Sequence, residues 1–245
     1  MIPDIEGSKA YDVAREAVVR ELDWTNQSRA RRVGCVFGDG SPHMVPPPAG
    51  PTLHVCCNAT AGPIAIAVHP AWAPRGAQRF LKLVDDGHFD AGVPLFRCLR
   101  NFICQFGLGA PSRNRRYRSI PDDPQWLPPG PANRVIDGRK RFPKGYLAYA
   151  GAGPNSRNIQ LILALADDGR LAGGSPWEVP WGQVVGPALT STLPRIYTGY
   201  GDRGPRQAHL AARGVDAGLK TAFPRLDYIT SCFKVGSTPY SSASD

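Results

Sequence analysis

The sequence predicts a mostly β protein: a closed antiparallel barrel capped by helices and preceded by a helix and an extended arm. Several short apolar segments are spread over residues 53–234, and only two helical patterns interrupt them. The 27 glycines and 25 prolines form more than a fifth of the 245 residues, so turns are abundant. Apolar residues make up 42% of the chain, which is enough for one core. Many short strands with few helices are typical of barrels.

The N-terminal region predicts a helix followed by an extended arm. Ser8 is a candidate N-cap for a helix that runs to about Trp24. Residues 38–51 read GDGSPHMVPPPAGP, a linker composition in which three consecutive prolines favour extended backbone. We therefore expect an N-terminal region over 1–51, one domain over 52–235 and a polar tail over 236–245. The helix has one apolar stripe at spacings of three and four, formed by Ala10, Val13, Ala14, Ala17, Val18 and Leu22.

The domain from residue 52 onward predicts strands separated by turns. LHVCCNA and PIAIAVH, joined by a Thr-Ala-Gly turn, predict a hairpin. A helix is expected over 73–86, with Ala77, Phe80, Leu81 and Val84 facing inward and Gly87 ending it. Residues 108–144 are long, Pro-rich and basic, which predicts a surface loop. Other strands are expected at 94–98, 102–107, 145–149, 159–164, 181–185 and about 226–234, and a second helix at 206–222, interrupted by Gly214 and Gly218.

The formal net charge of +9 is unevenly distributed. Between Leu95 and Gly145 there are eleven Arg and Lys residues and three Asp residues, and RNRRYR at 113–118 is the densest part. Such a cluster is either a solvated loop or a docking surface for an acidic protein, a lipid headgroup layer or RNA. Nucleic acid is the least favoured partner, because the chain has no aromatic-rich strand motif of the RNA-binding kind.

The cysteines and histidines predict no metal site. None of the six cysteines forms a C-x-x-C motif, and no histidine lies at ligand spacing from a cysteine or carboxylate. We expect buried free thiols, and a reducing compartment is favoured for that reason. No apolar run approaches the ~20 residues that span a bilayer. The acidic, polar start is unlike a signal peptide, so the cytoplasm and an organellar lumen or matrix after removal of a transit peptide are both compatible.

Two segments carry the most information about function. In LFRCLRNFICQFG (95–107), Arg97, Phe102, Gln105 and Gly107 keep the spacing of the pattern F-x-R-x-x-x-x-F-x-x-Q-x-G. The segment GYLAYAGAGPNSRNIQLIL (145–163) keeps a second pattern, G-x-L-x-M-A-x-A-G-P-N-x-x-x-x-Q. Together the two segments resemble the two halves of the active groove of the cyclophilin-type peptidyl-prolyl cis-trans isomerases. The positions that match the second pattern are Gly145, Leu147, Ala150, Ala152, Gly153, Pro154, Asn155 and Gln160.

The resemblance covers roughly residues 52–235. Residues 73–90 look like the first helix of the family, and WGQVVG (181–186) is similar to one of its strands. Residues 196–229 resemble a divergent branch with an extra C-terminal helix and a last strand like FPRLDYI. The resemblance implies a closed barrel of eight strands, a proline-containing polypeptide as substrate and no cofactor.

The resemblance also implies roles for individual residues. Arg97 falls on the catalytic arginine, and Gln105 on the glutamine that braces it and touches the substrate. Substrate-binding positions of the groove fall on Phe102, Ile103, Ala150, Gly151, Gln160 and Ile162.

Four residues depart from the family pattern. Gly151 stands where the family usually has asparagine, and Ile162 replaces a phenylalanine at the base of the proline pocket. At the far lip of the groove, Glu178 falls on a histidine position and Trp177 is displaced from the usual tryptophan. An acidic Glu178 near Arg97 could pair with it. The arginine centre is thus retained while the pocket is altered.

Two functions follow as hypotheses. The first is a peptidyl-prolyl isomerase with reduced activity, in which replacing Ile162 by Phe should raise turnover if the pocket is the defect. The second is a catalytically weakened scaffold subunit of a larger protein assembly. The N-terminal helix is too short to be stable alone, and its Pro-rich linker could carry it away from the barrel. We therefore expect the arm to contact another protein.

Overall fold

The computed structural model describes residues 34–43, 45–127, 135–136, 139–140, 142–167, 171 and 175–238. The predicted helix at 8–24 lies outside these residues, as does most of the polar tail, 239–245.

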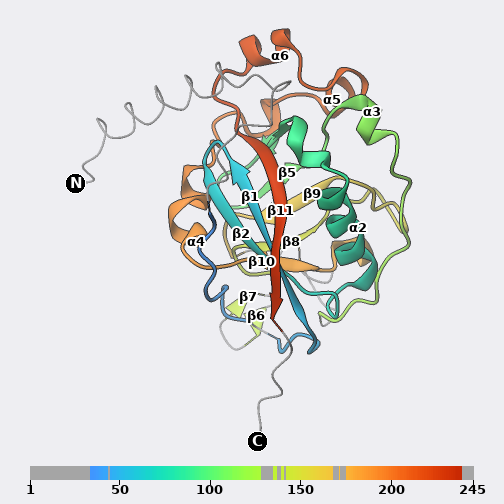
Figure 1. Cartoon of the computed structure of the whole chain (residues 1–245), viewed down its shortest axis with the longest axis vertical. Coiled ribbons are helices and arrows are strands. Elements are labelled where there is room, and N and C mark those ends of the chain that lie inside the picture. Colours follow the sequence, from blue (N-terminus) through green and yellow to red (C-terminus); the bar gives the residue numbers. More distant parts are fainter. Residues whose placement is uncertain are drawn as a thin grey trace, which may run out of the picture.

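Nine strands of the described chain form one antiparallel sheet in the order β3-β11-β1-β2-β10-β8-β9-β5-β4 (Figure 1). Two further strands, β6 (Val135–Ile136) and β7 (Arg139–Lys140), form a separate hairpin. The mostly β class is therefore confirmed. The nine strands are β1 (Thr52–Ala59), β2 (Gly62–Val68), β3 (Val93–Pro94), β4 (Arg97–Cys98), β5 (Ile103–Phe106), β8 (Tyr146–Tyr149), β9 (Leu161–Ala164), β10 (Gly182–Val184) and β11 (Tyr228–Thr238).

The sheet is a curled half-barrel, so the prediction of a closed eight-stranded barrel was wrong. Its two end strands, β3 and β4, are two-residue pieces of the segment that was expected as one strand at 94–98, and they do not pair with each other. Pro94 has no N–H to donate to a ladder. The next amide, of Leu95, donates to the carbonyl of Asp227, 2.8 Å away, beside β11. The two pieces of this segment therefore lie at opposite ends of the strand order, β3 paired with β11 and β4 with β5.

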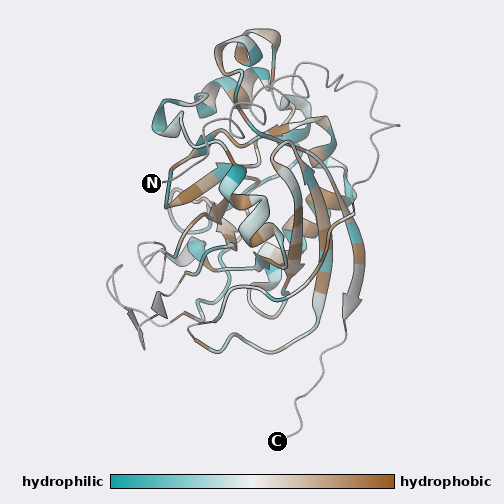
Figure 2. Cartoon of the chain, turned by 90° about the vertical axis from the view of Figure 1, so that its left-hand side faces the viewer, coloured by the Kyte–Doolittle hydropathy of each residue, from teal (hydrophilic) through white to brown (hydrophobic). Residues whose placement is uncertain are grey.

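The core lies on the inner face of the sheet under helix α2 (Pro74–Asp85). Along β2, Ile64, Ile66 and Val68 join this core, whereas Ala65 and Ala67 face the other way, as strand alternation requires. In α2, Pro74 occupies the first turn, where its missing N–H costs nothing. Leu83 is buried where Leu81 had been expected. In Figure 2 the strands carry most of the apolar stretches.

The predicted second helix is two short helices, α5 (Gln207–Arg213) and α6 (Ala217–Ala222). Gly214 separates them at a φ of 67°, a conformation that favours glycine, whereas Gly218 lies inside α6. Asp216 caps α6 by accepting a 2.7 Å hydrogen bond from the amide of Leu219. The remaining short helices are η2 (His88–Ala91), α3 (Pro111–Asn114), η3 (Pro176–Glu178), α4 (Ala188–Ser191), η4 (Leu193–Arg195) and η5 (Gly201–Arg203).

The segment 108–144 is more than the surface loop that its composition predicts. It contains α3, β6 and β7, and it contributes buried side chains to the protein. The basic cluster 113–118 is itself anchored, since the hydroxyl of Tyr117 donates a 2.8 Å hydrogen bond to Asp86. The buried side chains of the segment are Leu108, Asn114, Tyr117, Asp123, Leu127 and Phe142.

Residues 34–43, which we call the strap, lie against the outer face of the sheet. Cys35 and Phe37 of the strap pack on Ala65, Ala67 and Val185. The amide of Gly186 donates to the carbonyl of Asp39 at 2.8 Å, and the hydroxyl of Ser41 donates to the carbonyl of Lys144 at 2.6 Å. The strap therefore leaves little of this face of β2 and β10 open.

The six cysteines form three disulfides, so the prediction of buried free thiols was wrong. Cys56 and Cys57 point to opposite faces of β1 and pair with different partners, because strand neighbours alternate. The preference for a reducing compartment rested on free thiols and loses its support. The pairs are Cys35–Cys56, Cys57–Cys232 and Cys98–Cys104. No helix in the described part of the chain combines the length and apolar character needed to cross a bilayer.

Candidate functional site

The hairpin of β4 and β5 brings Arg97 opposite Gln105. The two residues are Cα partners in the ladder, so their side chains leave the same face of the sheet. A tight turn makes this register possible, with Asn101 at a φ of 57° and the amide of Leu99 donating to the carbonyl of Ile103 at 2.8 Å. Asparagine tolerates that left-handed conformation better than most residues. Local turn chemistry therefore places a cation beside an amide side chain.

Gln160 completes a polar row with these two residues. Its side-chain carbonyl accepts a 2.8 Å hydrogen bond from Nε2 of Gln105, which is 7% exposed. Its backbone carbonyl accepts from the amide of Ala150 at 3.0 Å, which sets Ala150 and Gly151 next to it. The structure thus gathers the predicted polar residues where β4, β5, β8 and β9 lie side by side.

The guanidinium of Arg97 is held by an acidic residue that sequence reasoning missed. Nε of Arg97 donates to Oδ1 of Asp202, in η5, at 2.6 Å. The side chains are 33% and 68% exposed, so water screens this ion pair. No ion pair joins Arg97 to Glu178 among the described residues, and the acidic residue that pairs with Arg97 is Asp202. The separation of 105 residues left no local signal for this contact.

The apolar part of the predicted groove is covered by the chain itself. Ile103 and Ile162 are only 5% and 3% exposed, and Phe102 and Ala150 are partly buried in the same cluster. We call the residues that cover them the cover: Trp72, Trp126, Leu127, Phe142, Tyr146 and Leu171.

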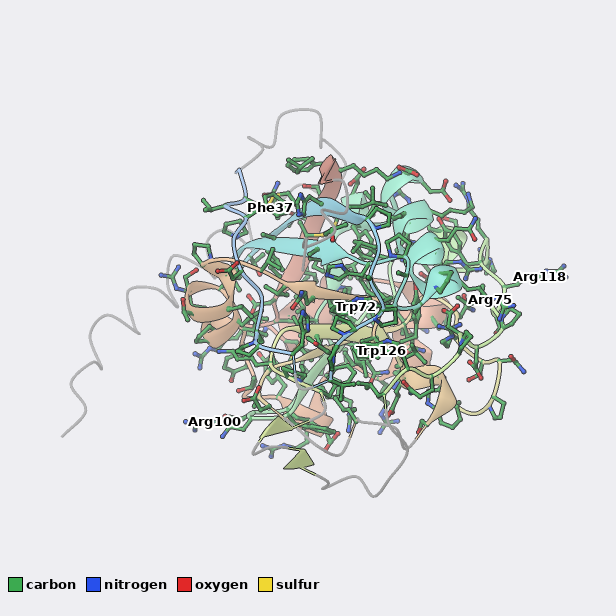
Figure 3. All side chains as sticks on the ribbon, turned by 90° about the horizontal axis from the view of Figure 1, so that it is seen from below. Phe37, Trp72, Arg75, Arg100, Arg118 and Trp126 are labelled. Carbon is green, nitrogen blue, oxygen red and sulfur yellow. A yellow bond between two sulfur atoms is a disulfide. The ribbon has the colours of Figure 1, made fainter. Side chains whose placement is uncertain are left out.

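Trp72 holds the cover together. Its ring centroid is 5.4 Å from that of Trp126, which lies beside it in Figure 3, and 5.4 Å from that of Tyr146. His69 stacks on it at 4.0 Å. Burial and the neighbouring charges of His43 and His54 lower the pKa of His69 to about 4, so the stacked ring is neutral at pH 7. The isolated Trp126, Leu127 and Phe142 in a Pro-rich basic stretch were the sequence signal that could have revealed the cover.

Trp177, which the sequence placed near the far lip of the predicted groove, contacts Gly151. A Cβ atom on Gly151 would lie 2.4 Å from the Trp177 ring, so only glycine permits this contact. The tryptophan that seemed displaced in the sequence therefore lies directly against the groove backbone. Next to it, burial raises the pKa of Glu178 to about 7.

A buried ion network fixes the loop that follows Gly151. Arg157 is fully buried, and its Nη1 donates to Oδ2 of Asp123 at 2.9 Å. Asp123 also accepts hydrogen bonds from the amides of Arg75 and Gly76 at 3.0 and 2.9 Å, so it caps α2 from another part of the chain. The network ties the segment that carries Trp126 both to α2 and to the groove loop.

No group of three metal-ligating side chains occurs among the residues that the structure describes. The polar centre consists of one guanidinium and two amides, which bind and orient a polypeptide backbone by hydrogen bonds.

The family match, which includes both segments, agrees with the two sequence motifs. Residues 54–209 match the family described as cyclophilin type peptidyl-prolyl cis-trans isomerase/CLD. No curated protein matches the chain. A cyclophilin type peptidyl-prolyl cis-trans isomerase of Cryptosporidium parvum is 17% identical with a TM-score of 0.48, over 76% of this chain and 98% of that one. Cyclophilin AquaCyp293 of Hirschia baltica is 13% identical with a TM-score of 0.48, over 74% of this chain and 73% of that one.

Proposed function

Because the chain belongs to the cyclophilin-type peptidyl-prolyl cis-trans isomerase family, we propose that it isomerises X–Pro bonds in polypeptides, with reduced turnover. The observation that carries this proposal is the row of Arg97, Gln105 and Gln160, joined by strand register and by a 2.8 Å hydrogen bond. We assign catalysis to Arg97 and Gln105. Substrate binding is assigned to Phe102, Ile103, Ala150, Gly151, Gln160 and Ile162.

The chemistry needs no nucleophile and no cofactor. The X–Pro bond resists rotation because the nitrogen lone pair is delocalised into the carbonyl, and the barrier is about 18–20 kcal/mol. A fixed cation near the prolyl nitrogen holds the lone pair on nitrogen and so stabilises the twisted transition state. Arginine suits this role because it stays charged and presents a rigid fork of donors.

Two contacts moderate the activity in this proposal. The Nε–H of Arg97 is engaged by Asp202, which leaves the Nη donors for a substrate. The cover fills the space over Ile103 and Ile162 where the proline ring would bind. The ring can enter only when the cover moves aside, and that displacement lowers the rate.

An exchange-NMR measurement of cis-trans interconversion in an Ala-Pro peptide tests the proposal. Arg97→Ala should lower the rate by at least about tenfold, since one electrostatic donor contributes about 10²–10³ in comparable sites. Asp202→Asn frees the guanidinium and should raise the rate. The matched control is Arg100→Ala, an exposed arginine on the same hairpin that points outward in Figure 3. Equal rates in the wild type, Arg97→Ala and Arg100→Ala would refute the proposal.

The covered pocket favours a second candidate function, a scaffold subunit of a larger protein assembly. Because Ile103 and Ile162 are buried, the fold has no open pocket for the proline ring. A fold can be retained after its activity is lost. In this candidate the N-terminal residues contact the assembly. A native pull-down with and without residues 1–33, together with the exchange measurement, separates the two. The scaffold function is favoured if the protein binds its assembly only when residues 1–33 are present and does not accelerate cis-trans exchange of the peptide.

A further inference from the structure

Helices α5 and α6 line a cavity that is open to solvent and that the isomerase chemistry does not use. Its volume is about 430 Å³, within the range of about 300–1,000 Å³ usual for ligand pockets. The two helices lie together at the top of the molecule in Figure 1. Leu219, Ala222 and Phe223 of α6 and its C-terminal end give the cavity an apolar floor. It can therefore bury apolar groups as well as bind charged ones.

The rim of this cavity is basic. Arg203, Arg206 and Arg213 line it, and all three are exposed. None of their guanidinium groups forms an ion pair or side-chain hydrogen bond with a described residue. One acidic group, Asp216, also lines the cavity, but it is engaged with the amide of Leu219 and lies 3.3 Å from His209. The three arginines therefore leave an excess of positive charge.

The basic rim is continuous with the surroundings of Arg97. A second cavity of about 250 Å³ is lined by Arg97 and Asp202 on one side. It shares Gly204, Pro205 and Arg206 with the cavity under α5 and α6. A polypeptide that contacts Arg97 on this side can thus extend over Arg206 into the larger cavity.

We propose that the α5–α6 cavity binds an acidic stretch of the client polypeptide close to the proline that is isomerised. The proposal rests on the proposed function and adds a substrate class to it. Glutamate or aspartate side chains pair with the three arginines, and an apolar side chain among them packs on Leu219 and Phe223. Charged groups on a rim select partners and raise the association rate more than they raise affinity.

Fluorescence anisotropy with labelled Ala-Pro peptides tests the binding. One peptide carries three glutamates before the proline, another carries three after it, and glutamine replaces each glutamate in the matched peptides. At low salt the full chain should bind one of the two acidic peptides, the one whose glutamates reach the cavity, about tenfold more tightly than the matched glutamine peptide. A factor of this size is expected because each exposed ion pair contributes modestly. The double variant Arg206→Gln, Arg213→Gln should lose most of this preference.

The control variant is Arg118→Gln, an exposed arginine that lines neither cavity and points away from the protein in Figure 3. It should keep the preference. Three results would overturn the proposal. The wild type could show no preference for the acidic peptides, the double variant could keep the preference, or Arg118→Gln could remove it as fully as the double variant does. A gain in affinity in Glu16→Gln, Glu21→Gln would assign the cavity to the N-terminal segment of the chain and would also overturn it.

Anisotropy does not depend on catalysis, so the two proposals fail separately. An inactive protein that still prefers the acidic peptide retains the cavity proposal as a binding site and loses the isomerase proposal. An active protein that treats both peptides alike loses only the cavity proposal.

Discussion

At the scale of single residues, packing gives a reason for the two departures from the family pattern in the groove. Gly151 is required by the Trp177 ring, which occupies the space that a Cβ would need. Ile162 is buried in one cluster with Ile103 and the cover, so a larger phenylalanine ring would have to displace these neighbours. Gly151 and Ile162 therefore fit their neighbours, and replacing either one by the residue usual in the family should not raise activity.

Ile162→Phe should destabilise the protein and leave isomerase turnover unchanged or lower. Inserting a larger ring into a packed cluster costs about 1–3 kcal/mol. The sequence alone favoured a rise in turnover, but the 3% exposure of Ile162 changes the expected result. Urea unfolding gives the stability and exchange NMR gives the rate, with Ile162→Val as the smaller control. Higher turnover in Ile162→Phe would show that the cover opens readily.

Glu178 should make stability fall as the pH rises from 5 to 8. Burial raises its pKa from the ordinary 4.5 to about 7, so the folded state binds its proton more tightly than the unfolded state. Stability from this group is present at low pH and is lost as the pH passes through about 7. The lowered pKa of His69 acts in the opposite sense, since its contribution is lost as the pH falls from 6.5 towards 4.

The comparison of wild type with Glu178→Gln isolates the carboxyl group from His69. From pH 5 to pH 8, the unfolding free energy of the wild type should fall by about 1–3 kcal/mol relative to that of Glu178→Gln, because glutamine does not titrate. Urea titrations at four pH values measure it. Parallel pH profiles would contradict the raised pKa.

At the scale of elements, local patterns were sufficient for the hairpin of β1 and β2, for α2 and for the break at Gly214. Each depends on neighbours in sequence: alternation, helical spacing or a left-handed glycine. The polar row was also predictable, because the hairpin register fixes Arg97 opposite Gln105. Asp202 was not, because it is 105 residues from Arg97 in the sequence. For the cover, the sequence showed isolated apolar residues in a loop-like segment but not the residues on which they pack.

Asp123→Ala should be strongly destabilising, because it breaks the link between the cover segment, α2 and the groove loop. The change leaves the fully buried Arg157 without its closest carboxylate and removes the cap of α2. Breaking a buried ion pair on one side costs about 3–5 kcal/mol. Urea unfolding measures the loss.

The control for Asp123→Ala is Asp85→Ala, which removes a 2.7 Å ion pair with Lys234 on the surface. An exposed pair contributes at most about 1 kcal/mol. Similar losses in the two variants would mean that the buried network carries no special weight.

At the scale of the whole molecule, disulfides and the strap join parts that the sequence presents as separate. Cys35–Cys56 fastens the strap to β1, and Cys57–Cys232 joins β1 to β11 across 175 residues. The sequence could not show these pairs, because pairing follows strand register and not spacing. The domain division near Pro51 stays a prediction, although residues 34–43 already pack on the sheet.

All six cysteines should be oxidised in the purified protein. Thiol titration in denaturant without reductant should find no free thiol, and reductant should lower the melting temperature. Cys35→Ser should cost about 3 kcal/mol in the chain-entropy account of disulfides, since the closed loop spans 21 residues. Six titratable thiols in the native preparation would contradict the disulfides and restore the case for a reducing compartment.

The position of β11 has a consequence for biosynthesis. This strand lies between β3 and β1, whose residues are made more than a hundred positions earlier. While the ribosome is still translating the middle of the chain, β3 lacks its partner strand and one edge of β1 stays unpaired. The sheet therefore cannot be completed until Thr238 has emerged from the exit tunnel, and such long-range strand pairing forms slowly.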